Sequence, residues 1–338
     1  MNSEGKWITI LIVGTISNLF LAISVNAETW QYKRGQQWQQ VSQEQDNYQL
    51  AVSQIKQLVD TGQTEQAAVA FDKLKKDYPE IAGDDYDAFV EIELLFADGN
   101  LTGSGKSCEK FVKKFPESRF YQAVLDRQYA IATAFLSGQK RKVAKVFKVR
   151  GYAEGQRMME KISDRSGQAP MGLKALQSVA ESLEKRGKYE DAYEEWSQIS
   201  SRYGDSDQIA EESLLAMGRC KHGAYKGPQY DASDLISAQS YYKNYVLKYV
   251  QKSQELEIQE KLKQISEQQA YKQFQIGRYY QNTGSTEAAN LYYQMVMENW
   301  PDTTAAKMAK DAFEGRMEDE KEKGWKRKTV ENIEKILL

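Results

Sequence analysis

A glycine, a small residue, an aromatic residue and a proline recur at one fixed spacing, and this feature constrains the fold most. Gly62 is followed by Ala67, Phe71 and Pro79, which lie five, nine and seventeen residues later. The same spacing recurs in two further sets: Gly284, Ala289, Tyr293 and Pro301, and then Gly187, Ala192 and Trp196 with Gly204 in the place of the proline. A motif repeated in this way is typical of an array of similar structural units.

Each position of the motif has a physical role in a pair of helices. The glycine ends the first helix, because it adopts the left-handed cap conformation at low cost. The small residue lets two antiparallel helices approach closely, and the aromatic residue one turn later fills the same face. The proline ends the second helix, since it cannot continue the hydrogen-bond ladder. This order is the signature of the tetratricopeptide repeat. The sequence therefore predicts an all-α, tetratricopeptide-like helical-hairpin solenoid of about five to six repeats over residues 45–313.

The composition agrees with a helical array and gives little sign of catalysis. Of the 338 residues, 41% are hydrophobic and 28% charged, as in helix-rich globular proteins. A net charge of −2 provides no global attraction for nucleic acid or anionic lipid. His222 is the only histidine, and with Cys220 it supplies two metal ligands where zinc needs three or four. We therefore expect no enzyme activity, no catalytic residues, no cofactor, no metal and no nucleic-acid partner.

The N-terminal segment is expected to stand apart from the repeats. Lys6 precedes an apolar run that ends at Val25, Asn26 and Ala27, which is typical of a secretory signal peptide covering residues 1–27 and cleaved after Ala27. The alternative is an uncleaved membrane anchor. Residues 28–44 contain alternating aromatic residues and are expected to form an extended cover for the first repeat, or a docking peptide for a partner. An exported chain permits a disulfide, but Cys108 and Cys220 would lie several repeats apart, so two separate buried thiols are expected.

Three irregularities interrupt the predicted array. Val143 and Phe147 follow Gly138 in register, which predicts a second helix there and makes the helix after Gly151 an inserted element. A turn is expected at His222, before an insertion at residues 224–234. A long helix over residues 254–282 is expected to project its charged first half beyond the array. Residues 314–338 are predicted to form a charged amphipathic helix that caps the array or binds a partner.

One stretch resembles a nucleotide-binding loop. Gly103 to Ser107 reads GSGKS, which is similar to the end of a P-loop. The full motif needs a glycine five residues before Gly105, where Asn100 stands, and a buried strand before the loop. The preceding stretch is helical in pattern, so residues 103–107 are expected to begin a helix.

The chain resembles the BamD-type outer-membrane assembly lipoproteins over roughly residues 45–313. The resemblance is carried by the signal peptide, the repeats of slightly long period, the long helix and three closures: Tyr78-Pro79-Glu80, Phe115-Pro116-Glu117-Ser118 and Trp300-Pro301-Asp302-Thr303. It implies a periplasmic scaffold associated with the outer membrane, whose partners are assembly proteins and unfolded segments of β-barrel proteins. The family has a lipid-anchor cysteine just after the signal peptide, but Glu28 stands there. Membrane association is therefore expected through partners, or the chain is another periplasmic adaptor in a cell-envelope or cell-wall complex.

A peptide-binding groove is expected along the first helices of the repeats. The candidates in the first three repeats combine aromatic and charged side chains: Gln49, Val52, Lys56, Tyr86, Phe89, Glu93, Phe96 and Gln128. Such a groove suits a peptide that ends in an aromatic residue. The alternative is that Phe89 and Phe96 belong to the core.

Overall fold

The computed structural model describes residues 30–31, 39–40, 43–143 and 147–315. The signal peptide predicted for residues 1–27 and nearly all of the tail predicted as a helix, residues 314–338, lie outside these ranges. The chain divides into two compact units, Met1–Glu80 and Ile81–Leu338, and each is described by itself.

The first unit holds one pair of helices. Strand β1 (Trp30–Gln31) pairs with β2 (Gln39–Gln40) in antiparallel register, in line with the extended segment expected there. Helix α1 (Gln43–Asp60) then packs against α2 (Thr64–Asp77), and a short 3-10 turn, η1 (Pro79–Ile81), follows. Gly62 turns the chain between the helices with a φ of 76°, as the sequence predicted. That residues 28–44 cover the first repeat stays a prediction.

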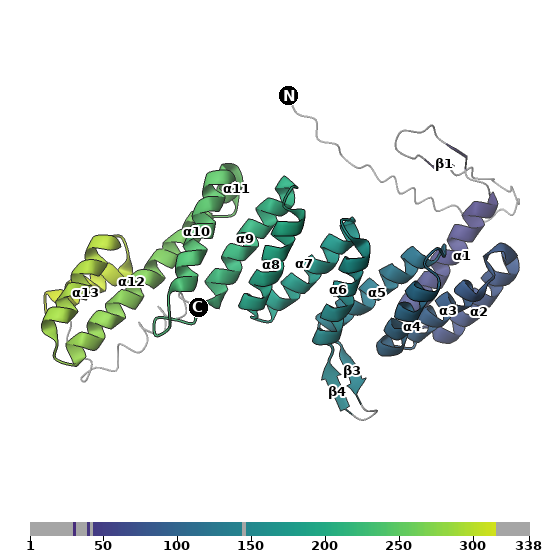
Figure 1. Cartoon of the computed structure of the whole chain (residues 1–338), viewed down its shortest axis with the longest axis horizontal. Coiled ribbons are helices and arrows are strands. Elements are labelled where there is room, and N and C mark those ends of the chain that lie inside the picture. The colour runs from purple at the N-terminus through teal and green to yellow at the C-terminus, as the bar shows by residue number, and fades with distance from the viewer. Residues whose placement is uncertain (1–29, 32–38, 41–42, 144–146, 316–338) are drawn as a thin grey trace, which may run out of the picture. The chain divides into compact units, whose positions relative to one another are not determined.

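The second unit is a row of helical hairpins (Figure 1). Its elements are α3 (Asp84–Ala97), α4 (Leu101–Lys114), α5 (Tyr121–Leu136), β3 (Lys140–Val143), β4 (Phe147–Arg150), α6 (Tyr152–Ser166), α7 (Pro170–Lys185), α8 (Tyr189–Tyr203), α9 (Asp207–Ala224), α10 (Ser233–Lys248), α11 (Val250–Glu255), α12 (Ile258–Asn282), α13 (Thr286–Asn299) and α14 (Thr304–Phe313). Five packed pairs are α3–α4, α5–α6, α7–α8, α9–α10 and α12–α13, and α14 packs on both helices of the last pair.

Equivalent seam positions are found in every pair, although those of the third pair, Gly155 and Met159, were not the ones predicted. The small residue is Ala67, Ser104, Gly155, Ala192, Ala238 or Ala289, and the large residue one turn later is Phe71, Cys108, Met159, Trp196, Tyr242 or Tyr293; all of them are buried. Three helices end at the predicted closures, where the N–H groups of Tyr78, Phe115 and Trp300 bond back to the preceding turn. The fold is all-α and tetratricopeptide-like, as the sequence predicted.

The third pair departs from the prediction. Residues after Gly138 form the antiparallel hairpin of β3 and β4, in which Val143 pairs with Phe147. The second helix of this pair is α6, the helix that the sequence analysis took for the insertion. That assignment was wrong because Val143 and Phe147 imitate the helical spacing by coincidence. The inserted element is the hairpin.

The turn expected at His222 is also wrong. Helix α9 continues through this residue to Ala224. A Cβ added to Gly223 would lie 2.6 Å from the ring of Tyr189, so the glycine provides room for a packed aromatic ring.

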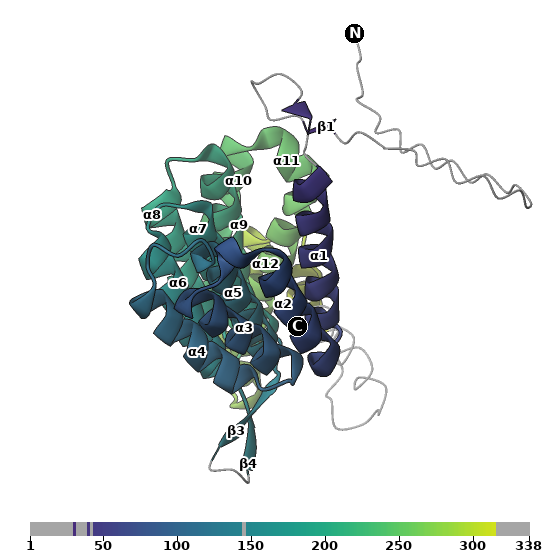
Figure 2. The ribbon, with the colours of Figure 1, turned by 90° about the vertical axis from the view of Figure 1, so that its right-hand side faces the viewer.

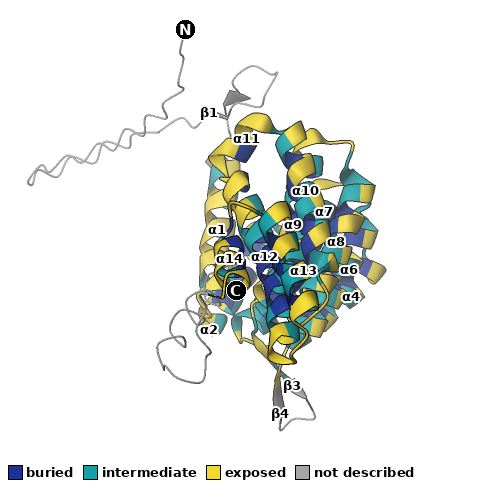
Figure 3. Ribbon diagram, turned by 90° about the vertical axis from the view of Figure 1, so that its left-hand side faces the viewer, coloured by how far each residue is buried: buried dark blue, intermediate teal, exposed yellow. Residues whose placement is uncertain are grey.

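The long helix expected over residues 254–282 is α12, which has 25 residues and begins at Ile258, four residues later than expected. Glu257 has a φ of 51° and separates α11 from α12. The first half of α12 does not project freely, because Ile258 and Ile265 are buried against Leu235 and Tyr242 of α10. Only Ser253 is buried in α11, and Figure 3 shows that short helix mostly in the exposed colour.

Candidate protein-binding surfaces

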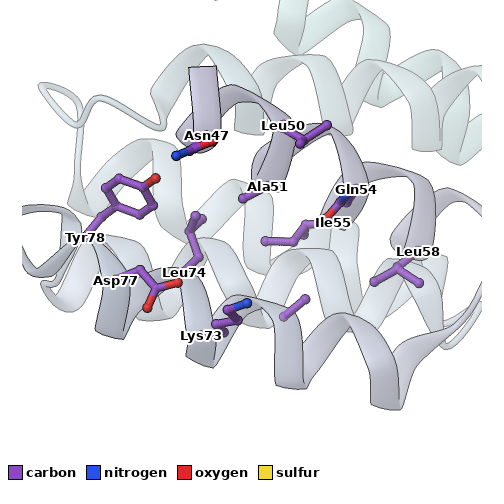
Figure 4. Close-up of a pocket in the computed structure, with 11 residues that line it drawn as sticks. Asn47, Leu50, Ala51, Gln54, Ile55, Leu58, Lys73, Leu74, Asp77 and Tyr78 are labelled. Atoms are coloured by element: carbon purple, nitrogen blue, oxygen red, sulfur yellow. The ribbon is translucent and has the colours of Figure 1, made fainter. Parts of the chain in front are cut away.

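A groove runs between α1 and α2 of the first unit (Figure 4). Its volume is about 740 Å³. Apolar side chains come from both helices, and polar side chains stand among them; the lining consists of Asn47, Leu50, Ala51, Gln54, Ile55, Leu58, Ala70, Lys73, Leu74, Asp77 and Tyr78. The groove thus offers apolar contact together with hydrogen-bonding groups, the combination that binding sites in proteins use.

The floor of the groove is packed, whereas one wall is open to solvent. Ile55 and Leu74 are buried, and Tyr78 meets the ring of Tyr48 edge to face at 4.9 Å between centroids. Leu50 remains 58% exposed. A bound segment would therefore cover an apolar side chain that the first unit leaves in water.

The predicted candidates on α1 do not line this groove. Gln49, Val52 and Lys56 are exposed, but none of them lines the groove between α1 and α2. The groove uses Leu50 and Leu58, which are not among the predicted candidates. The sequence did contain a signal for this groove. The apolar stripe on α1 is wider than the single helix α2 can cover.

The candidates on α3 and α5 lie largely inside the second unit. Tyr86, Glu93 and Gln128 are buried, so these three side chains serve packing in this structure. Phe89 and Phe96 are half-buried. Phe89 stacks on Phe120 with 5.1 Å between ring centroids, and this packing favours the alternative that it belongs to the core. Peptide binding by the remaining candidates stays a prediction.

A buried ion pair joins α3 to α5. Arg127 donates from Nε and Nη2 to the two carboxylate oxygens of Glu93 at 2.7 and 2.6 Å. Phe96 lies beneath the guanidinium, with 4.0 Å from Cζ to the ring centroid. Because both charges are removed from water, the pair is held by its two-pronged geometry and by the aromatic face.

A second charged cluster joins α4 to α6. Arg165 Nη2 donates to Glu109 Oε2 at 2.7 Å, and Lys161 lies 3.4 Å from the same oxygen. Burial alone would raise the pKa of Glu109, but the hydrogen bond and charge of Arg165, with Lys161, lower it below its usual value. The buried amide of Gln128 completes the cluster by contacting Glu109 and Arg165.

Polar contacts continue between the first helices of successive pairs. The hydroxyls of Tyr129 and Ser178 lie 2.7 Å apart between α5 and α7. Between α7 and α9, Arg219 donates to Glu184 at 3.1 and 3.2 Å. His222 Nε2 lies 2.8 Å from Gln268 Oε1 between α9 and α12, and burial lowers the pKa of this histidine.

The sequence analysis missed this set of contacts, although a signal exists. Glu93 and Arg127 are separated by 34 residues, and Glu184 and Arg219 by 35. Both separations match one repeat length, which brings equivalent positions of neighbouring first helices together. Opposite charges at that separation predict such a pair.

The two thiols are separate and inert. Cys108 and Cys220 are free and buried, as expected. Burial raises the pKa of each thiol to about 12, so neither forms a thiolate at neutral pH. In the part of the chain that the structure describes, no group of three His, Cys, Asp or Glu residues is arranged to hold a metal.

The stretch that resembles a P-loop lies within α4. Asn100 caps this helix by accepting a hydrogen bond from the Gly103 N–H at 3.0 Å, and the Ser104 hydroxyl donates to the carbonyl of Ile92 at 2.9 Å. Residues 103–107 are helical, as predicted. Among the described residues, none of the helices has the length and apolar character needed to cross a membrane.

A comparison with protein-family models supports the repeat fold. A tetratricopeptide-repeat family model matches residues 47–80 and 273–303. No curated protein matches the chain. Among solved structures, the chain is similar to PilW, described as a widely conserved type IV pilus biogenesis factor, with 13% identity, 79% of this chain and 99% of that chain covered, and a TM-score of 0.29. The matched repeats and the packed helix pairs show that this chain contains tetratricopeptide repeats and has an all-α, tetratricopeptide-like fold.

Proposed function

We propose that this protein is a periplasmic adaptor that binds segments of other proteins and assists the assembly of outer-membrane β-barrel proteins, as BamD-type proteins do. The observation that carries the binding role is the groove between α1 and α2. Its apolar floor and polar rim suit a protein segment that inserts one or two apolar side chains. The predicted signal peptide and the aromatic-proline closures support the proposed cellular role.

The exposed wall of the groove gives the proposal a direct test. A photo-crosslinking residue at Lys73 should capture a segment bound in the groove of the full-length protein in native envelopes, and mass spectrometry would identify the partner. Leu50→Glu should reduce the captured product about tenfold, because it places a charge where an apolar side chain would be buried. Its stability cost should be small, since Leu50 is 58% exposed.

The matched control is Val69→Glu, because Val69 is 70% exposed on α2 and does not line the groove. This variant should capture as much partner as the wild type. Equal loss in both variants, or capture of no envelope protein by the wild type, would refute the adaptor proposal. Recovery of an outer-membrane β-barrel or assembly protein would support the BamD-like role.

A second candidate is an adaptor in a different cell-envelope or cell-wall complex. It is favoured by Glu28, which stands where BamD-type proteins carry the lipid-anchor cysteine. The same crosslinking experiment decides between the two, because this candidate expects cell-wall enzymes or other lipoproteins in place of barrel proteins.

A further inference from the structure

The β3–β4 hairpin projects from the helices of the second unit. Figures 1 and 2 show it extending away from α5 and α6, the two helices that it connects. Its eight strand residues, Lys140–Val143 and Phe147–Arg150, include five cations and no acidic residue. This charge stands out in a chain whose net charge is −2. The seam residues Gly155 and Met159 lie outside the hairpin.

The strand register sorts these residues into two faces. Lys140 pairs with Arg150, and Lys142 pairs with Lys148. Paired residues, and residues two apart along a strand, share a face. One face therefore carries these four cationic residues. The other carries the pair Arg141 and Val149 and the pair Val143 and Phe147, which are mainly apolar.

The base of the hairpin is fixed to α6. The Gly151 N–H donates to the Gln139 carbonyl at 2.9 Å, and Arg150 Nη1 donates to the Tyr152 hydroxyl at 2.8 Å. Arg141 lies 3.8 Å from the carboxylate of Glu154. The hairpin is thus held in a defined direction at its base.

One edge of the hairpin is available to a further strand. The sheet has two strands among the residues that the structure describes, so each strand has one edge without a strand partner. Because helix α4 contacts β3, we take the edge of β4 (Phe147–Arg150) as the better candidate for a further strand. A two-stranded hairpin is only marginally stable, and an added third strand would stabilise it.

We propose that the edge of β4 binds an extended protein segment in which acidic and apolar residues alternate. Such a segment would add as a third strand through main-chain hydrogen bonds. Its acidic residues would share the face of Lys148 and Arg150, and its apolar residues would share the face of Phe147 and Val149. Alternation is the pattern of a strand with two different faces. The inference deepens the proposed adaptor function and rests on it.

The cations also account for selectivity. Lysine residues on an edge strand prevent pairing with an identical edge, since like charges would meet. The same residues favour an acidic strand. The hairpin is therefore protected from association with its own copies while it remains open to a partner of opposite charge.

The test measures binding of a short fluorescent peptide with alternating glutamate and valine to the full-length protein by fluorescence anisotropy. Lys142→Glu/Lys148→Glu should weaken binding about tenfold or more, because two attractions become repulsions. Lys243→Glu/Lys248→Glu on α10 changes the net charge equally, at exposed positions away from the hairpin, and should leave binding within about twofold. Circular dichroism verifies that both variants keep their helical content.

Methylated forms of the peptide test the main-chain contacts. Two further peptides carry methyl groups on alternate backbone nitrogens, one peptide for each edge of the extended chain. The methyl groups remove hydrogen-bond donors along that edge and leave every side chain unchanged. At least one of these two peptides should bind about tenfold more weakly or worse. Undiminished binding of both would overturn the inference. So would equal loss in the two protein variants, or hairpin-dependent binding to phosphatidylglycerol vesicles without binding of the parent peptide. Groove-dependent crosslinks that persist in Lys142→Glu/Lys148→Glu would show that the adaptor function stands even if the hairpin inference fails.

Discussion

The helix pairs α5–α6 and α7–α8 follow one plan but differ in how the chain passes from the first helix to the second. A short turn at Gly187 joins α7 to α8, whereas the β3–β4 hairpin separates α5 from α6. Despite this, Gly155 and Met159 in α6 occupy the same seam positions as Ala192 and Trp196 in α8. The repeat is thus defined by the faces of its helices, and the turn between them is free to accept an insertion.

The seams of these two pairs are closed in different ways. In α8 the bulk is supplied by Trp196, whose Nε1 donates to Glu184 of α7 at 2.6 Å. Helices α5 and α6 approach closely at Gly155, since a Cβ there would lie 2.7 Å from the carbonyl oxygen of Ala132. One pair therefore depends on a large side chain, and the other on the absence of one.

The largest expected effect comes from removing the large side chain of the regular pair. Trp196→Ala should lower the free energy of unfolding by about 4 kcal/mol, because it opens a cavity and leaves the Glu184 carboxylate without the indole donor. Met159→Ala at the equivalent position of α6 should cost about 3 kcal/mol. Urea unfolding followed by circular dichroism measures both. If Trp196→Ala lowers the free energy of unfolding less than Met159→Ala does, the α7–α8 seam does not depend on its large side chain.

The close approach of α5 and α6 predicts the opposite sensitivity to an added methyl group. Gly155→Ala should destabilise the protein by about 2 kcal/mol, although alanine favours helices, because the contacts at 2.7 and 3.0 Å involve the α5 backbone. The reciprocal change, Ala192→Gly, should cost about 1 kcal/mol from helix propensity and a lost contact. Thermal and urea unfolding compare the two. A stabilising Gly155→Ala would show that the helices separate without cost.

The sequence predicted the features that arise from local rules. Gly62, Gly187 and Gly284 turn with positive φ, and Ala192 and Trp196 lie in the seam, because each depends on spacing within one hairpin. The sequence analysis failed where two patterns overlap. Val143 and Phe147 fit the helical register, but the apolar and cationic residues that alternate from Phe147 to Arg150 also fit a strand, and the strand formed.

The candidate site was harder to predict than the fold. Which side of α1 forms a groove depends on how α2 is placed against it, and the apolar pattern shows only that Leu50 and Leu58 avoid water. Similarly, Glu93 and Arg127 become a buried pair only when α3 and α5 stack. Single-helix patterns do not contain this information, since it is set by the packing of one helix on another.

The two compared pairs come close at Glu195 of α8, and this site predicts a pH dependence. Burial, with the charges of Glu160 on α6 and of Glu194 and Asp191, raises the pKa of Glu195 to about 6. The unfolded value is lower, so the fold favours the protonated form, and stability at this site is lost as the pH rises from about 4.5 through 6.

Glu195→Gln should therefore stabilise the protein at pH 8 by about 1 kcal/mol, after allowance for solvent screening of a partly exposed group. Below about pH 4.5 the difference should vanish, because glutamate is then protonated in both states. Urea unfolding across this pH range tests it, and Asp205→Asn in the turn after α8 is the control. A gain that persists at low pH would have a cause other than charge.

The smallest effect is expected from removing the hairpin, and it tests whether α5–α6 and α7–α8 are the same repeat. Replacing residues 140–150 with a short glycine-serine turn should change the free energy of unfolding by about 0.5 kcal/mol or less. The ion pair of Arg141 with Glu154 is at the surface, and the entropy of loop closure varies slowly with loop length. Lengthening the α7–α8 turn by the same number of residues is the matched control. A loss of several kcal/mol on removal would show that the hairpin completes the fold of α5–α6, whereas a neutral result leaves binding as the reason for its charge.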